Sequence, residues 1–220
     1  MSDRSRLVRF AGVLTVASVM ICAFATTALA LDQTPVSRMI KGDSNGTGYI
    51  AGDGAILTWL EWVYGSESTS ISIHAIDVHA AGSKEVTIAV DATCPVVSGR
   101  NIFYTDELGV HQTNFDSSET TLLASFTNAA SKPFSLAVSG DILVWDHGGP
   151  SGPVEGMHLS TGERFMISND QNSYQPDVAG DWVVYTKNFE KPDSYINGDI
   201  KAYQISTGRT YTLCNNARRQ

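Results

Sequence analysis

The stretch VSGDILVWD, residues 138–146, decides how the rest of this chain is interpreted. A glycine and an aspartate mark a tight turn, and an almost entirely apolar strand candidate follows and ends at an aromatic residue. Related stretches occur at residues 50–59, 97–106 and 178–186, and in each a glycine stands five residues before an aromatic. The four pairs are Gly54 and Trp59, Gly99 and Tyr104, Gly140 and Trp145, and Gly180 and Tyr185.

These four glycines are 45, 41 and 40 residues apart, and each interval contains only strand and turn signals. A period of about 40–50 residues of this kind is typical of propeller blades. Each repeat divides into four short strand candidates, most clearly in the third repeat. We therefore predict an all-β chain, a β-propeller of four-stranded antiparallel blades. The propeller repeats span residues 49–214, with legible blades at about 49–90, 91–130, 131–171 and 172–214.

The first thirty residues have the features of a secretory signal peptide. Three arginines within residues 1–9 precede an apolar run, and Ala28-Leu29-Ala30 fits a small-residue cleavage site. An uncleaved anchor is the alternative, but the apolar stretch after Arg9 is short for a bilayer of about 30 Å. We expect cleavage after residue 30 and a secreted chain, meaning extracellular, cell-surface or periplasmic.

The composition argues against nucleic acid as a partner. The whole chain has 15 basic and 23 acidic residues. The leader contains three of the basic residues and one of the acidic ones, so 12 and 22 remain and the net charge is −10. Because such a chain repels phosphate backbones, we expect no nucleic-acid binding. We also expect no membrane span after signal cleavage, since no later segment is long and apolar enough.

Nothing in the sequence has the spacing of a metal site, and we expect no cofactor and no metal. None of the five histidines stands at ligand spacing from another. Asp53, Asp141 and Asp181 follow the turn glycines, where aspartate bonds its own backbone, so we assign them a structural role. Export permits a disulfide between Cys94 and Cys214, and free thiols are the alternative.

The repeats resemble those of the TolB-like propellers and related secreted propellers. The resemblance rests on Val138-Ser139-Gly140-Asp141 with Val144-Trp145, and on the turn Ser160-Thr161-Gly162-Glu163. The last repeat matches through residues 176–181, 184–185 and 205–208, and the resemblance covers about residues 36–213. It implies a propeller fold and says little about activity, because propellers have many functions.

The number of blades departs from this resemblance, which implies six or more. Residues 31–48 form an N-terminal segment in which residues 36–41 read as one further outer strand, and residues 215–220 form a polar tail. In a complete propeller such a strand would pair with a final blade, but the sequence ends soon after the fourth. We therefore predict an open or incomplete ring, with possible self-association through exposed blade edges.

The loops between the second and third strands are where we expect binding, because repeats vary where they bind. Three of these loops are long, at residues 60–69, 146–153 and 187–198, and they share a face with the linkers between blades. Aromatic side chains with a few polar groups suit a protein or carbohydrate partner, although ordinary solvated loops are the alternative. The candidate ligand-binding residues are Trp62, Tyr64, His147, Tyr174, Phe189 and Tyr195.

The sequence contains no catalytic constellation, so we assign no catalytic residues. A nucleophile elbow of the G-x-S-x-G type is missing, and spacing alone cannot identify a carboxylate pair in a β fold. We therefore predict a secreted, non-enzymatic module that recognises a protein or glycan through its loop face. The alternatives are a polysaccharide-active lyase or glycosidase on a propeller, and a truncated propeller fragment without independent function.

Overall fold

The computed structural model describes residues 46–64, 69–126, 132–148, 152–188 and 198–214. Within these ranges every regular element is a β-strand, so no helix there is long and apolar enough to cross a membrane. The expected leader, the expected outer strand at residues 36–41 and the polar tail lie outside the described residues.

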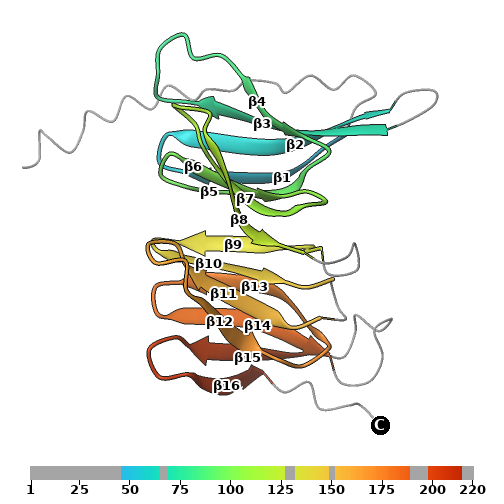
Figure 1. The fold of residues 1–220 in the computed structure, drawn as a ribbon, viewed down its shortest axis with the longest axis vertical. Helices are drawn as coiled ribbons and strands as arrows, with labels where there is room; N and C mark the ends of the chain where they lie inside the picture. The colour runs from blue at the N-terminus through green and yellow to red at the C-terminus, as the bar shows by residue number, and fades with distance from the viewer. Residues whose placement is uncertain (1–45, 65–68, 127–131, 149–151, 189–197, 215–220) are drawn as a thin grey trace, which may run out of the picture. The chain divides into compact units, whose positions relative to one another are not determined.

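Sixteen strands form four antiparallel sheets of four strands each, which confirms the predicted fold class (Figure 1). The first sheet consists of β1 (Gly46–Asp53), β2 (Ile56–Tyr64), β3 (Thr69–Asp77) and β4 (Val86–Val90). The second consists of β5 (Thr93–Ser98), β6 (Asn101–Thr105), β7 (Gly109–Asn114) and β8 (Thr120–Ser125). The third consists of β9 (Leu136–Ser139), β10 (Ile142–Asp146), β11 (Val154–His158) and β12 (Arg164–Ser168). The fourth consists of β13 (Ser173–Ala179), β14 (Trp182–Asn188), β15 (Gly198–Gln204) and β16 (Arg209–Cys214).

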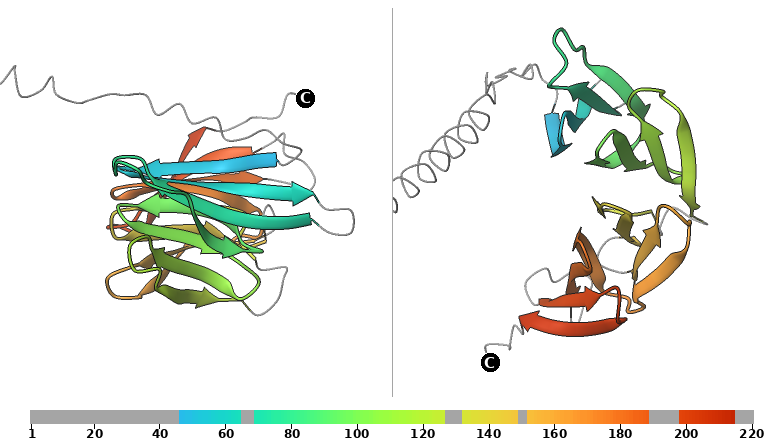
Figure 2. Two further views of the ribbon diagram at one scale, coloured as in Figure 1. Left: turned by 90° about the horizontal axis from the view of Figure 1, so that it is seen from above. Right: turned by 90° about the vertical axis from the view of Figure 1, so that its left-hand side faces the viewer.

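Each sheet is a meander whose consecutive strands pair, and consecutive sheets pack on one another. The first strands of neighbouring sheets are in contact, β1 with β5, β5 with β9 and β9 with β13. Figure 2 shows the sheets following one another in chain order, with the first and fourth at the two ends of the series. The series does not close into a ring, as predicted.

Buried apolar clusters hold each sheet to the next. Trp145 is completely buried and lies in one cluster with Phe103 and Val110 of the second sheet. Tyr104 lies in a cluster with residues of the first sheet, and Tyr185 in a cluster with residues of the third. The exposed fractions of the repeated aromatics are 4% for Trp59, 6% for Tyr104, 0% for Trp145 and 5% for Tyr185. Burial of large rings at one repeat position is the packing expected between stacked repeats.

The aspartates of the Gly-Asp turns form hydrogen bonds with residues that are distant in the sequence. Gly140 has a φ of 57°, in the region that glycine adopts without strain. The Asp141 carboxylate accepts hydrogen bonds from the Ser160 backbone N–H at 2.7 Å and the Ser160 hydroxyl at 2.9 Å. Asp181 accepts the same pair from Ser206, at 2.8 and 2.6 Å. The three aspartates do have a structural role, but with other partners than their own backbone. Asp141 and Asp181 each join the two turns at one end of their sheet. Asp53 accepts a hydrogen bond from the Gly99 N–H of the second sheet at 2.8 Å.

The region predicted as a loop at residues 60–69 is largely strand. β2 continues to Tyr64, and β3 begins opposite it at Thr69. Residues 60–64 include large aromatic and β-branched side chains, which favour strands. The Trp62 ring also lies over Gly48 of β1, where an added Cβ would come within 2.5 Å of the ring. The predicted loop at 187–198 begins later as well, because β14 extends to Asn188.

Both cysteines of the described region are free thiols, Cys94 buried and Cys214 exposed. Burial raises the pKa of Cys94 to about 11, so this thiol stays protonated at neutral pH. Its Sγ donates to the Phe134 carbonyl at 3.0 Å, and this contact joins the second sheet to the segment before β9. Cys94 therefore acts as a small buried side chain.

We expect Trp145→Ala to lower the free energy of unfolding by about 3–5 kcal/mol, because it leaves a large cavity between two sheets. Chemical denaturation followed by far-UV circular dichroism measures this loss. Phe134→Ala is the control, since that ring is 63% exposed and its removal should change stability by no more than about 0.5 kcal/mol. Equal midpoints for Trp145→Ala and wild type would contradict the packing described above.

The two turn aspartates should make stability depend on acidic pH. Hydrogen bonds from Ser160 and Ser206, their side-chain hydroxyls first, hold the pKa values of Asp141 and Asp181 below the usual 3.8. A pKa that is lower in the folded state gives stability that is full above the unfolded value and is lost as pH falls through the folded value. We expect the melting temperature to fall below about pH 4 for this reason.

The variant Asp141→Asn/Asp181→Asn tests this assignment in melting curves between about pH 7 and pH 2. It should melt below wild type at neutral pH and lose less stability on acidification. Ser160→Ala/Ser206→Ala removes only the hydroxyl donors and should change the curve in the same direction, by a smaller amount. A pH dependence identical to wild type in both variants would remove these aspartates from the explanation.

Candidate functional site

One position on the third strand of every sheet has a titratable side chain. It is the position that pairs with the buried aromatic of the second strand. His74 pairs with Trp59, His111 with Tyr104, Glu155 with Trp145, and Lys201 with Tyr185. Because directly opposite residues share a face of the sheet, each titratable group lies beside a buried ring. We call His74, His111, Glu155 and Lys201 the titratable row.

The two histidines of the row stack on their aromatic partners. The ring centroids of His74 and Trp59 are 5.8 Å apart with an interplanar angle of 18°, and those of His111 and Tyr104 are 5.2 Å apart at 12°. Stacking fixes each imidazole plane, so its nitrogens point along the face of the sheet. His111 Nε2 lies 2.9 Å from one oxygen of Asp106.

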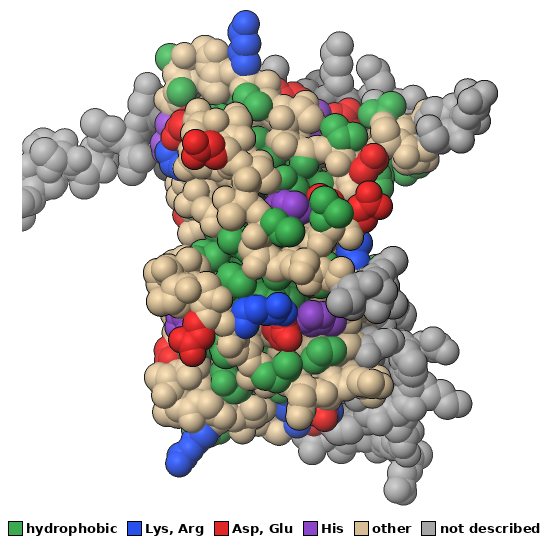
Figure 3. Space-filling view, viewed as in Figure 1, with side chains coloured by type: hydrophobic (Ala, Val, Ile, Leu, Met, Phe, Trp, Pro, Cys, Tyr) green, Lys and Arg blue, Asp and Glu red, His purple; other side chains and the backbone are tan. Residues whose placement is uncertain are grey.

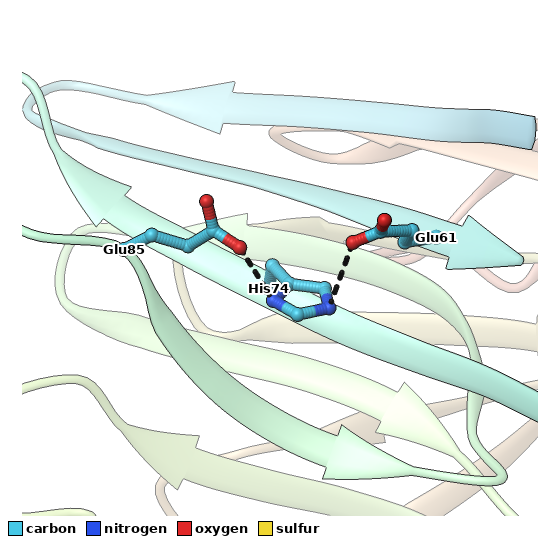
Figure 4. Close-up of side chains that lie close together, drawn as sticks. All are labelled: Glu61, His74 and Glu85. Carbon is cyan, nitrogen blue, oxygen red and sulfur yellow. Dashed lines mark ion pairs between the residues drawn. The ribbon is translucent and has the colours of Figure 1, made fainter. Parts of the chain in front are cut away.

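His74 lies between the carboxylates of Glu61 in β2 and of Glu85, the residue before β4 (Figure 4). Its Nε2 is 3.3 Å from Glu61 Oε2 and 2.8 Å from Ser72 Oγ, and its Nδ1 is 2.9 Å from Glu85 Oε1. The contact with Glu85 lacks hydrogen-bond geometry, which leaves Nδ1 buried without a hydrogen bond. We call Glu61, His74 and Glu85 the first-sheet cluster.

Glu155 of the row lies between two hydrogen-bond donors, the imidazole of His147 and the guanidinium of Arg164. Its Oε2 is 3.1 Å from His147 Nε2 and also pairs with Arg164, whose guanidinium lies 5.3 Å from the centre of the Trp145 ring. Hydrogen bonds from His147 and then from Arg164 hold the pKa of Glu155 below its usual value, against the opposing effect of burial. Figure 3 shows basic, acidic and histidine side chains beside the hydrophobic surface at the junction of the second and third sheets.

Lys201 opens onto a groove between the third and fourth sheets. The groove has a volume of about 510 Å³, a size suited to a small ligand. The third sheet and the linker after it contribute residues 166–170, and the fourth sheet contributes the other wall. That wall consists of Tyr185, Lys187, Lys201, Tyr203, Gly208 and Thr210. We call this site the lysine groove.

The lysine groove contains two lysines, each paired with a carboxylate, beside several hydroxyl groups. Burial lowers the pKa of Lys187, and the positive charge of Lys201 lowers it further. Lys187 pairs with Asp170 at the rim, and Lys201 Nζ lies 3.1 Å from Asp199 and 2.8 Å from Thr212 Oγ1. Each of the two ammonium groups is therefore balanced by a carboxylate in this structure.

Tyrosine adds donors to this groove. Burial raises the pKa of Tyr185, so its hydroxyl keeps its proton at neutral pH and can donate a hydrogen bond. Ser168 and Thr210 contribute two more hydroxyls to the lining, and Asn169 contributes an amide. The groove therefore offers hydroxyl, amide and charged side chains to a polar molecule.

The residues predicted from the loops are dispersed among different elements. Trp62 is half-buried within β2, and Tyr64 is 61% exposed at its end. His147 is half-buried just after β10, and Tyr174 is buried in β13. Phe189 and Tyr195 lie outside the described residues. A role for any of them in ligand binding stays a prediction.

The lysine groove was missed by sequence reasoning, although a signal for it exists. Tyr185 and Lys187 are two apart on one strand, and Lys201 and Tyr203 are two apart on the next. Alternation within a strand puts each pair on one face, and antiparallel pairing puts Tyr185 opposite Lys201. Two lysines and two tyrosines on one buried face of a repeat could have been identified from the sequence in this way.

One of three comparisons places this fold among known proteins. No family model matches the chain, and no curated protein matches it. A search of solved structures finds the puromycin-hydrolyzing peptidase of Mycobacterium tuberculosis with a TM-score of 0.62 and 15% identity, covering 80% of this chain and 30% of that one. The acylaminoacyl peptidase of Pyrococcus horikoshii matches with a TM-score of 0.58 and 11% identity, covering 79% and 33%.

The oligogalacturonate lyase of Vibrio parahaemolyticus matches with a TM-score of 0.54 and 12% identity, covering 74% of this chain and 50% of that one. This chain is a partial β-propeller. At such low identity the likeness shows the fold alone, and the chain spans between about a third and a half of the length of these three proteins. The lysine groove of this partial propeller lies between its third and fourth blades.

Proposed function

We propose that this partial propeller is an exported, non-enzymatic module that binds an acidic glycan in the lysine groove. The observation that carries the proposal is the placement of two lysines and two tyrosines on one wall of a groove of about 510 Å³. Lysine ammonium groups attract carboxylates, and the tyrosines offer hydroxyl groups to a sugar. Export rests on the predicted signal peptide.

The polar lining favours a sugar over an apolar ligand. Ser168, Thr210 and the tyrosines supply hydroxyl groups that can donate to and accept from the hydroxyls of a saccharide. The two lysines, which pair with Asp170 and Asp199 in this structure, can also attract the carboxylate of a uronic acid or another carboxylated sugar. An acidic peptide would use the lysines as well, but it would leave more of the hydroxyl lining without a partner.

The inner strands support a binding role. β1, β5, β9 and β13 are the first strands of their blades and lie side by side. Their residues are mostly small, apolar or hydroxyl-bearing; they include no histidine, and Asp53 and Asp177 are their charged members. Asp53 and Asp177 belong to the first and fourth blades, so they come from the two ends of the series and not from neighbouring blades.

A glycan-cleaving enzyme is the second candidate, and one observation favours it. Lys187 has a pKa lowered by burial and lies in the same groove as the protonated Tyr185 hydroxyl. A lysine of lowered pKa can accept a proton, and a tyrosine can donate one. In that case an acidic glycan would be a substrate of the lysine groove.

Isothermal titration with oligogalacturonate of defined length tests both candidates. We expect Lys187→Gln and Lys201→Gln each to weaken binding about 10-fold, which corresponds to about 1.4 kcal/mol. Lys84→Gln removes an exposed lysine of the segment between β3 and β4 and should leave the affinity unchanged. Trp62→Ala and Tyr64→Ala should also bind as wild type if the groove is the site, whereas a loss in these variants would favour the loop face.

The identity of the ligand is tested with matched probes. A neutral gluco-oligosaccharide of the same length should bind at least 10-fold more weakly than the acidic one. Equal binding of the neutral sugar, or tighter binding of an Asp-rich peptide, would contradict an acidic glycan as ligand. Chromatography of the sugar after incubation separates binding from cleavage, since shorter products would establish the enzyme.

A further inference from the structure

The first-sheet cluster brings two carboxylates and one imidazole together. Its three side chains meet on one face of the first sheet (Figure 4). Glu61 belongs to β2 and His74 to β3, and Glu85 directly precedes β4. Even with a protonated imidazole, two carboxylates leave the three groups with a net negative charge. The side chains are 25%, 12% and 40% exposed respectively, so water screens this charge only in part.

The other members of the titratable row are balanced differently. His111 faces the carboxylate of Asp106, and Lys201 faces that of Asp199. Glu155 lies between His147 and Arg164. Among the described members of the row, only His74 combines one imidazole with two carboxylates, so the same slot of the repeat has a different chemistry in the first blade.

We propose that the first-sheet cluster is a binding site for a divalent transition-metal ion such as Zn²⁺. One ligand atom from each of the three residues can be chosen so that all lie within 4.8 Å of one another. Around zinc, with ligands at about 2.0–2.2 Å, tetrahedral neighbours are about 3.5 Å apart. The contacts of His74 with Glu61 and Glu85, at 3.3 and 2.9 Å, are already close to this spacing, so the imidazole and one glutamate can share an ion with little movement.

The arrangement around the imidazole indicates how the three residues would divide the task. Glu61 and Glu85 lie at opposite ring nitrogens, 3.3 and 2.9 Å away. A zinc ligand histidine usually donates its second nitrogen's proton to a carboxylate, which fixes the ring. One glutamate would therefore bind the ion beside one nitrogen of His74 while the other bonds the opposite nitrogen, and water would complete the coordination.

The donor set selects the kind of ion. An imidazole with carboxylates suits Zn²⁺, Ni²⁺ or Cu²⁺, whereas Mg²⁺ and Ca²⁺ prefer oxygen ligands alone. Stacking on Trp59, which is 4% exposed, holds the imidazole plane before any ion binds. The same contact provides a spectroscopic signal, because a bound paramagnetic ion close to this indole would quench its fluorescence.

Zinc titration by calorimetry on the full chain, expressed without a histidine tag, tests the proposal. We expect one zinc ion per chain and a rise in melting temperature with zinc concentration. His74→Ala should weaken binding at least 100-fold, and Glu61→Gln and Glu85→Gln should each weaken it about 10- to 100-fold. Circular dichroism without zinc checks that each variant is folded.

The repeat provides a matched control. His111→Ala removes a histidine from the equivalent slot, where it also stacks on an aromatic and faces a carboxylate, and it should bind zinc as wild type does. Copper should quench the fluorescence of wild type more than that of Trp59→Phe. The proposal is overturned if wild type binds no zinc, if His74→Ala binds it unchanged, or if His111→Ala loses as much affinity as His74→Ala.

Discussion

Packing of each blade on the next through a buried aromatic is the constraint that the rest of the structure depends on. A four-stranded sheet with two apolar faces cannot be stable alone, because one face would remain in water. Trp145, completely buried against the second sheet, shows how large a side chain this junction accepts. The second-strand aromatic therefore sets the distance and the order of the blades.

A buried carboxylate reinforces one of these junctions. Asp146, which has no exposed surface, accepts hydrogen bonds from the Phe134 and Ser135 backbone N–H groups and from the Ser135 hydroxyl, at 2.8, 3.2 and 2.6 Å. It also accepts one from Gln175 N–H of the fourth sheet, at 3.1 Å. These bonds join the third and fourth blades. They do so at the end of the blades where the linker between β12 and β13 runs, and this linker forms part of the lysine groove.

The sequence predicted the fold well because the fold depends on local repetition. A glycine five residues before an aromatic marks a turn and a buried strand, and both signals are contained in a short stretch. The loop boundaries were harder to predict from the sequence. Trp62 and Tyr64 belong to β2, which is paired with β3, rather than to a loop, and only the pairing of Trp62 with Ile71 and of Tyr64 with Thr69 shows this. The three residues of the first-sheet cluster are 13 and 11 positions apart, and only strand register brings them together.

In each blade, the fold depends on the buried aromatic of the second strand, whereas the residue opposite it in the titratable row differs in chemistry from blade to blade. The aromatic opposite each row position is large and buried in all four blades, whereas the row itself contains two histidines, a glutamate and a lysine. The backbone thus tolerates acid, base and imidazole at one and the same slot. A lineage of such chains could exchange the chemistry of a single blade by one or two substitutions while the architecture stays unchanged, which makes each blade an independent unit of functional divergence.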